Sequence, residues 1–233
     1  MLYDVNSLDT KRRESLGLLE PDAFQEPLEV KDHQTFEIGG ANSTWPHVFA
    51  SRMELAPLQC IGMALKTSSR WEFAETYVHK NLLETEYLAM KMGLRKPVAE
   101  LHYHFWTFFD MKQLASDGFK TDKTACLVGW AYTVTSDGKT PQRVRDQLKY
   151  LAEVEISQFQ IHPLHRCEGF GRSCVEAIHQ YDAGQTRTTL ECLHNAAGFY
   201  KCCGFEPPKE TMGQMDSLPE YTWLVRDRIP EKP

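Results

Sequence analysis

The 233-residue sequence predicts an α/β fold, in which a mixed and mostly antiparallel sheet carries helices on its faces. Two apolar, aromatic-rich segments, residues 101–109 and 125–135, are separated by a Ser-Asp-Gly turn sequence, which favours an antiparallel pair of strands. In the second half of the chain, strand patterns alternate with helix patterns. Hydrophobic residues make up 42% of the chain, which is enough to build a core.

The composition limits the cellular setting and the class of partner. The polar N-terminus lacks the apolar run of a signal peptide, and no segment has the roughly 20 apolar residues that span a bilayer. The seven cysteines are scattered and include no CxxC pair, which indicates reduced thiols rather than disulfides or a zinc site. We therefore expect a cytoplasmic or nuclear protein without a metal or a membrane contact. A net charge of −6 disfavours nucleic acid and favours a cationic partner, such as an amine or a basic protein tail.

Residues 1–95 are predicted as an N-terminal extension that packs on a core domain of residues 96–233. Within the extension, residues 1–40 are charged and have little apolar periodicity, which indicates an irregular arm. Residues 45–49 and 58–65 are short apolar segments, which favours two short strands. Apolar residues at helical spacing predict a long packing helix over residues 70–92.

The second half of the chain begins with an irregular strand. Residues 153–161 alternate as a strand, but the apolar parity changes between Ile156 and Phe159, so a one-residue slip at Ser157 and Gln158 predicts a β-bulge. Helices are predicted over 169–181 and 195–203, strands over 188–193 and 221–225, and a polar, basic loop or short helix over 140–149.

The loop that joins the strand at 153–161 to the following helix is a candidate anion site. The first N–H groups of a helix have no partner within it, and the helix dipole attracts negative charge to them. The spacing does not fit a dinucleotide fingerprint, because Cys174 takes the place of the third glycine. The Gly-Lys-Ser/Thr sequence of a Walker loop is missing as well. A different phosphate-bearing ligand is therefore expected.

Two motifs resemble those of the GNAT superfamily of acyl-CoA-dependent N-acyltransferases. The first is Arg166-x-x-Gly169-x-Gly171 after an apolar strand, and the second is Phe-Tyr-Lys-Cys-Cys-Gly-Phe at residues 199–205. The resemblance extends over residues 125–226. It implies a twisted, mostly antiparallel sheet with a splayed central strand pair and helices on both faces.

Shorter segments are similar to two different branches of this superfamily. Residues 106–109, 128–130, 157–158 and 177–181 are similar to type B histone acetyltransferases. Residues 198–205 are instead similar to glucosamine-6-phosphate N-acetyltransferases. The two similarities point to different acceptors, so a protein lysine and a small-molecule amine both stay open.

The resemblance implies acetyl-CoA as the co-substrate. The end of the bulged strand would pair with the pantetheine arm, and the glycine-containing loop would hold the pyrophosphate. The residues concerned are Phe159, Gln160 and Ile161 in the strand, and Arg166, Cys167, Glu168, Gly169, Phe170, Gly171 and Arg172 in the loop. Asn195 matches an asparagine of the superfamily that contacts the cofactor, and a helix N-cap is its alternative role.

The resemblance also assigns Tyr200 as the general acid that protonates the departing CoA thiolate, with a plain core tyrosine as the alternative. A base must take a proton from the acceptor ammonium. Glu155 stands at the offset from Arg166 that lysine acetyltransferases of the superfamily use for their glutamate. Glu153 on the same strand, His194 after the next strand and a water chain are the alternatives.

The resemblance therefore implies direct transfer of an acetyl group from acetyl-CoA to a primary amine, without a covalent enzyme intermediate. A non-catalytic module of the same fold, which binds acyl-CoA or a protein, is the alternative. No motif indicates the acceptor or the oligomeric state.

Overall fold

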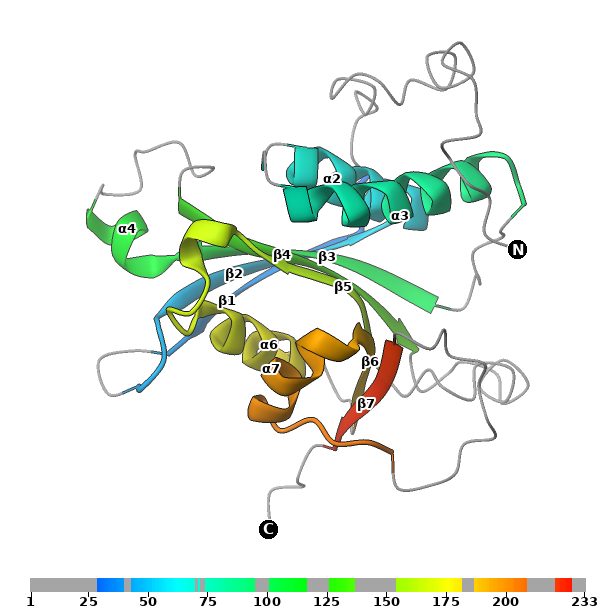
Figure 1. The fold of residues 1–233 in the computed structure, drawn as a ribbon. Helices are drawn as coiled ribbons and strands as arrows, with labels where there is room; N and C mark the ends of the chain where they lie inside the picture. Colours follow the sequence, from blue (N-terminus) through cyan, green and yellow to red (C-terminus); the bar gives the residue numbers. More distant parts are fainter. Residues whose placement is uncertain are drawn as a thin grey trace.

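The computed structural model describes residues 29–39, 43–69, 71, 74–94, 101–116, 126–136, 154–181, 187–208 and 221–227. These residues form one sheet whose strands follow chain order (Figure 1). All neighbouring strands are antiparallel except β5 and β6, which run parallel. The strands are β1 (Asp32–Ile38), β2 (Val48–Leu55), β3 (Leu101–Asp110), β4 (Leu127–Ser136), β5 (Val154–Ile161), β6 (Arg187–Leu193) and β7 (Tyr221–Asp227).

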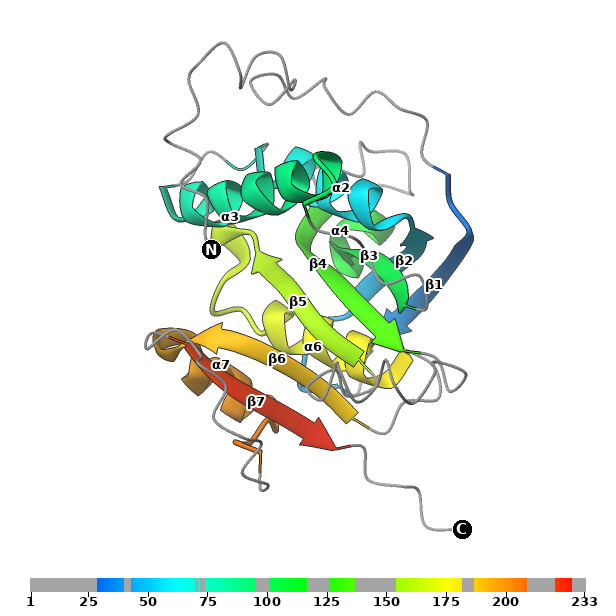
Figure 2. The ribbon, with the colours of Figure 1, turned by 90° about the vertical axis from the view of Figure 1, so that its right-hand side faces the viewer.

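Helices cover both faces of the sheet, as Figures 1 and 2 show. Helices α2 (Pro57–Ser69) and α3 (Ala74–Lys91) pack together on one face, and α6 (Phe170–Tyr181) and α7 (Ala197–Cys202) lie on the other. Helix α4 (Met111–Ser116) follows β3. Two 3-10 turns, Pro163–His165 and His194–Ala196, precede α6 and α7. This arrangement confirms the predicted mixed, mostly antiparallel fold. No described helix is long and apolar enough to cross a membrane.

Each face of the sheet has its own core. Between α2, α3 and the sheet lies the α2-side core, which includes Leu55, Ile61, Leu65, Leu83, Tyr103, Phe105, Trp130, Tyr132 and Val134. Between α6, α7 and the sheet lies the α6-side core, which includes Val48, Ala50, Trp106, Phe108, Val154, Ile156, Val175, Ile178, Leu190, Tyr200 and Phe205. The face to which a strand residue points can therefore be read from the core that it joins.

Two predictions for the N-terminal segment are wrong. Residues 58–65 lie in helix α2 and not in a strand, because Cys60, Ile61, Ala64 and Leu65 recur at helical spacing and are all buried against the sheet. The supposed arm of residues 1–40 contains strand β1, since Phe36 and Ile38 contact the α6-side core while Glu37 between them is exposed. The predicted helix over 70–92 is confirmed as α3.

The N-terminal strands extend the same sheet as the later ones. Strand β2 pairs with β3 along its whole length, and β1 pairs with β2. The expected boundary between residues 95 and 96 lies outside the described residues, as does the polar segment 140–149.

The predicted bulge in β5 is confirmed. In the register between β4 and β5, Tyr132 faces Gln158 and the next residue, Thr133, faces Ile156, so Ser157 is the extra residue. The insertion changes the parity of the strand. As a result, Ile156 before it and Phe159 after it both contact the α6-side core.

Candidate active site

Strands β5 and β6 pair along only part of their length. The register joins Val154–Ile156 to Thr188–Leu190, and no pairing with β6 is found for the described residues 157–161. The edge of β5 beyond the bulge therefore turns unpaired backbone groups toward the gap. An extended ligand can satisfy such groups as an added strand would. This divergence confirms the splayed strand pair.

Gln160, in this unpaired stretch, has a side chain that is already engaged. It is buried, and its Oε1 accepts a hydrogen bond of 3.3 Å from the Ser68 hydroxyl on α2. The side chain of Gln160 is therefore not available to a ligand in the gap, and its backbone oxygen lies toward Gly129 on β4.

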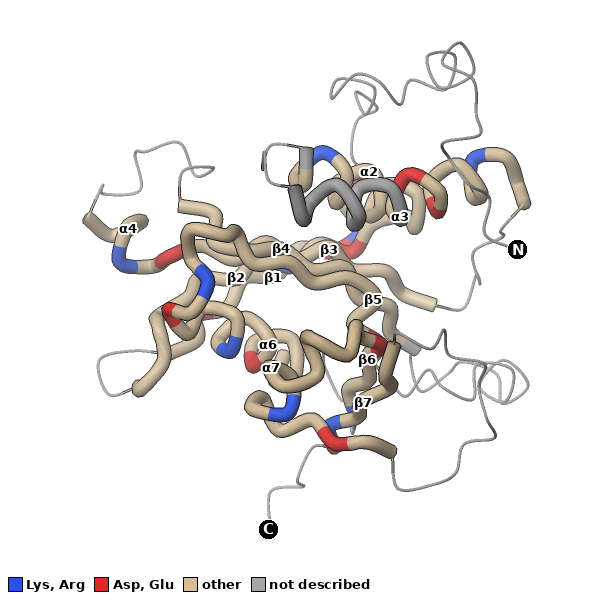
Figure 3. The backbone as a smooth tube through the Cα atoms, in the orientation of Figure 1, with Lys and Arg blue, Asp and Glu red and all other residues tan. Residues whose placement is uncertain are grey.

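The end of β5 leads directly into a loop with an unusual backbone. Cys167 has φ 64° and Gly169 has φ 89°, and α6 begins at Phe170. The backbone N–H groups of Arg172 and Ser173 both donate to the carbonyl of Gly169. The loop carries one basic and one acidic position, and the first turn of α6 carries a second basic one (Figure 3). The loop thus combines a helix N-terminus with positive charge, as an anion site would.

The two glycines of this loop are required by packing as well as by any ligand. A Cβ on Gly171 would lie 3.1 Å from the ring of Phe199 on α7. A Cβ on Gly169 would lie 3.0 Å from Cδ of Pro46, in addition to the strain of the positive φ. The glycines of the motif therefore also allow α7 and the segment before β2 to pack closely on this loop.

The charged side chains of the loop have different neighbours. Arg166 donates from Nε to the carbonyl of Ile161 at 3.3 Å, which holds it at the end of β5. The Arg172 guanidinium lies 3.7 Å from the centroid of the Trp45 ring. Glu168 forms a contact of 3.4 Å with His165. All three predicted charged residues therefore border the loop.

Tyr200 lies on α7 beside the gap and is buried among aromatic rings. Its ring meets those of Phe159, Phe199 and Phe205 edge to face. Burial raises the pKa of the Tyr200 hydroxyl well above its usual range, and the nearby Cys192 and Cys203 add to this effect. The hydroxyl therefore keeps its proton at neutral pH. No hydrogen bond from it is found to any described residue.

Glu155 approaches the gap from the opposite face. It pairs with Val134, a member of the α2-side core, whereas Tyr200 belongs to the α6-side core. The Ser157 hydroxyl at the bulge donates to its Oε1 at 3.0 Å. Because β5 and β6 separate just beyond this point, groups from the two faces can reach one ligand between them.

The other predicted residues are placed less favourably. Glu153 lies outside the described residues. The His194 ring contacts the carbonyl of Tyr221 at 3.0 Å and is thus tied to the start of β7. Asn195 does not cap α7, because the N-cap residue is Ala196 and makes no side-chain cap hydrogen bond, so the N-cap alternative is wrong.

Glu191 is a candidate that sequence reasoning missed. It stands on β6 between Leu190 and Cys192, which both join the α6-side core, so it points to the same face as Glu155. Glu155 faces Thr189 in the parallel register, two residues before Glu191. Partial desolvation raises the pKa of the Glu191 carboxyl, and no ion pair holds it among the described residues. The available signal was a carboxylate between two apolar residues of a strand, Leu190 and Cys192.

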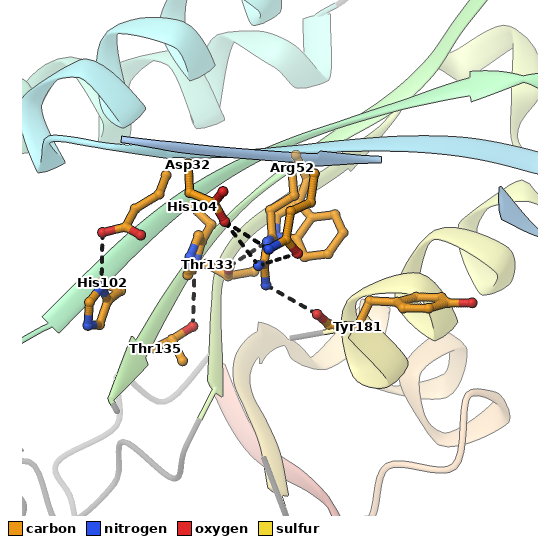
Figure 4. A network of polar contacts seen from close by, with 10 residues as sticks. Asp32, Arg52, His102, His104, Thr133, Thr135 and Tyr181 are labelled. Carbon is orange, nitrogen blue, oxygen red and sulfur yellow. Dashed lines mark hydrogen bonds and ion pairs between the residues drawn. The ribbon is translucent and has the colours of Figure 1, made fainter. Parts of the chain in front are cut away.

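The histidines of β3 belong to a separate polar network (Figure 4). His102 lies 2.9 Å from Glu54, and His104 lies 3.4 Å from the Thr135 hydroxyl. Burial and the neighbouring Arg52 lower the pKa of His104 to about 3. Within the part of the chain that the structure describes, no three His, Cys, Asp or Glu side chains gather as a metal site.

Comparisons with known proteins yield only distant similarities. No protein-family profile and no curated protein sequence match the chain. An acetyltransferase structure from Thermus thermophilus covers 63% of this chain and 75% of its own, with 17% identity and a TM-score of 0.38. The match to a spermidine N-acetyltransferase chimera from Vibrio cholerae and hSSAT covers 76% of this chain and 95% of the chimera, with 13% identity and a TM-score of 0.40. The match to a structure from Desulfovibrio desulfuricans assigned to the GNAT family of acetyltransferases covers 76% of this chain and 98% of that protein, with 14% identity and a TM-score of 0.36. Because these identities and TM-scores are low, the fold and the candidate site are assigned from this chain's own strands and side chains.

Proposed function

We propose that the protein is a GNAT-type N-acetyltransferase, which transfers an acetyl group from acetyl-CoA to a primary amine by direct attack. One observation carries this proposal: the unpaired edge of β5 leads, through the short 3-10 turn Pro163–His165, into the glycine loop at the start of α6. An extended pantetheine arm and a pyrophosphate require these two features in this order. Tyr200 lies beside the same gap.

In the proposed complex, the backbone of Phe159–Ile161 pairs with the pantetheine arm, and the amides at the start of α6 hold the pyrophosphate. Arg166 and Arg172 add charge-assisted hydrogen bonds from either side of the loop. The thioester then lies near the bulge at Ser157, where a backbone N–H polarises its carbonyl.

The proposed reaction needs no covalent intermediate. A carboxylate, Glu155 or Glu191, or a water bound to it, takes one proton from the acceptor ammonium. The freed amine forms the C–N bond to the thioester carbon, and the nitrogen then gives up its second proton to water or to a carboxylate. The C–S bond breaks, and the departing thiolate receives a proton from the Tyr200 hydroxyl, which is afterwards reprotonated by water.

The chain's own thiols indicate how the thiolate is treated in this environment. Near Tyr200, burial raises the pKa of Cys203 to about 11 and also raises the pKa of Cys192. A CoA sulfur in the same surroundings should likewise hold a proton more strongly than in water. The same burial raises the pKa of Tyr200, so the donor and the acceptor of the proposed proton transfer both hold their protons more strongly than in water.

The proposal also includes two possible classes of acceptor and two possible locations in the cell. A small amine or the lysine of a basic protein tail both suit two carboxylates on the α2-side face and a net charge of −6. Seven free thiols, five of them buried, suit the cytoplasm or the nucleus.

Turnover with a panel of acceptors tests the proposal. Purified protein, acetyl-CoA and histone peptides, polyamines or amino sugars should release free CoA thiol with at least one acceptor. Tyr200→Phe should then lower kcat by about 100-fold or more, because proton transfer to the thiolate is lost, with CoA affinity nearly unchanged. Tyr181→Phe, on the neighbouring helix α6, is the matched control and should keep the wild-type rate.

Two results would contradict this function. If CoA raises the melting temperature but no acceptor releases thiol, the protein is a binding module. If Tyr200→Phe weakens CoA binding as much as it slows turnover, Tyr200 is a packing residue and not the acid.

A further inference from the structure

The segment Ser43–His47, just before β2, lies against the start of α6. The Ser173 hydroxyl donates to the carbonyl of Pro46 at 2.9 Å. The ring of Pro46 fits against Gly169, and Trp45 lies beside it, with its Cε3 3.9 Å from the place that a Cβ on Gly169 would take. A part of the chain remote in sequence from the glycine motif thus borders the loop.

Arg172 occupies an unfavourable position for a cation. It is the third residue of α6, where the positive end of the helix dipole repels a guanidinium. No described carboxylate lies within ion-pair distance of it. The side chain is instead held 3.7 Å from the centroid of the Trp45 ring, a distance at which a cation interacts with the π electrons.

This stacking also sets where the charge lies. Because the indole borders Gly169, a guanidinium stacked on it stays beside the loop and does not extend into solvent. Trp45 remains 38% exposed, so its ring does not serve mainly to fill the core. The arrangement therefore fixes a cation, without an anionic partner among the described residues, at a helix N-terminus.

We infer that Trp45 is a positioning residue for the phosphates of the CoA thioester, acting through Arg172. The inference rests on the proposed function, since it names how that site is assembled. Fixing the guanidinium before the ligand arrives removes the entropy cost of ordering a long side chain on binding. Trp45 acts on cofactor binding and not on the chemical step, and it makes the N-terminal segment part of the cofactor site.

The test compares CoA with pantetheine, which lacks every phosphate. By isothermal titration, Trp45→Leu should weaken CoA binding about 3- to 30-fold, the range expected when a cation–π contact is lost. The affinity for pantetheine should stay unchanged, and so should kcat at saturating acetyl-CoA. Trp45→Phe keeps a ring under the guanidinium and should fall between wild type and Trp45→Leu.

A double-mutant cycle with Arg172→Gln separates positioning from packing. If Trp45 acts through Arg172, adding Trp45→Leu to Arg172→Gln should cause little further loss of CoA affinity. Unchanged or tighter CoA binding by Trp45→Leu would overturn the inference, and so would equal losses for CoA and pantetheine. If Trp45→Leu does not fold, Trp45→Phe and Arg172→Gln give the same comparison. Failure of the acetyltransferase proposal would appear as absent turnover, which leaves these titrations readable.

Discussion

At the scale of single residues, Gly129 on β4 has no room for a side chain, because strand β5 packs directly against it. A Cβ there would lie 2.6 Å from Cδ1 of Ile161 and 2.9 Å from the backbone oxygen of Gln160. These two residues form the edge of β5 that is proposed to bind pantetheine. Gly129 on β4 therefore allows β5 to lie close behind the ligand.

Gly129→Ala should destabilise the protein by about 1–3 kcal/mol, because the added methyl group forces β5 to shift. Chemical denaturation followed by circular dichroism measures the change. Gly198→Ala is the matched control, since nothing lies within 4 Å of its Cβ position. It should be neutral or stabilising by up to about 1 kcal/mol, as expected for Gly replaced by Ala in a helix. Equal losses in both variants would contradict this account.

Two carboxylates, Glu155 and Glu191, are candidates for the proposed base, and the pH dependence of turnover distinguishes them. A base works only when ionised, and the raised pKa of Glu191 places its ionisation above that of an ordinary glutamate. If Glu191 is the base, kcat/KM of the wild type should fall as the pH drops through this raised pKa. Glu191→Gln should then abolish the acid limb, while Glu155→Gln preserves it. The opposite pattern assigns the base to Glu155, and a limb that survives in both variants points to a water chain.

At the scale of elements, Arg52 joins β2 to the end of α6. Its buried guanidinium donates to the carbonyl of Tyr181 at 3.1 Å and to Oε1 of Gln34 at 2.8 Å, and it lies over the ring of Trp106 (Figure 4). A cation at a helix C-terminus is favoured by the dipole. The N-terminal strands thereby help to hold α6, the helix that begins at the proposed phosphate loop.

Arg52→Met should lower the free energy of unfolding by about 2–3 kcal/mol, since the charge-assisted hydrogen bonds of a buried guanidinium are lost. Arg52→Lys is the control: it keeps the charge but cannot reach two acceptors as a fork, so its loss should be smaller. Removing the charge should also raise the pKa of His104 toward its usual range, which NMR titration can follow. A His104 pKa that does not move would show that desolvation alone lowers it.

The sequence predicts some elements of the site better than others, for physical reasons. The bulge at Ser157 could be predicted because apolar parity along one strand is a local signal. Helix α2 was not predicted because a short apolar run does not distinguish a helix from a buried strand. The role of Glu191 depends on which strand lies beside β6, and Trp45 reaches the loop only through tertiary packing. Neither relation is encoded in local spacing.

At the scale of the whole molecule, the two faces of the sheet divide the proposed work. The α6-side face carries the proposed phosphate loop and Tyr200, whereas the α2-side face carries Glu155 and Glu191. The gap between β5 and β6 is the place where residues from both faces can reach the same ligand. This separation, together with the participation of β1 and β2 in the same sheet, could be inferred only from the assembled strands.

The short parallel pairing has a mechanical consequence. Strands β6 and β7 are joined to the other strands of the described sheet only through Val154–Ile156, so backbone hydrogen bonds bridge this seam over three residues. The seam is the compliant line of the sheet. A tensile load applied between β1 and β7 should part the sheet there first, and a ligand bonded along the edge of β5 would reinforce this line and raise the force needed.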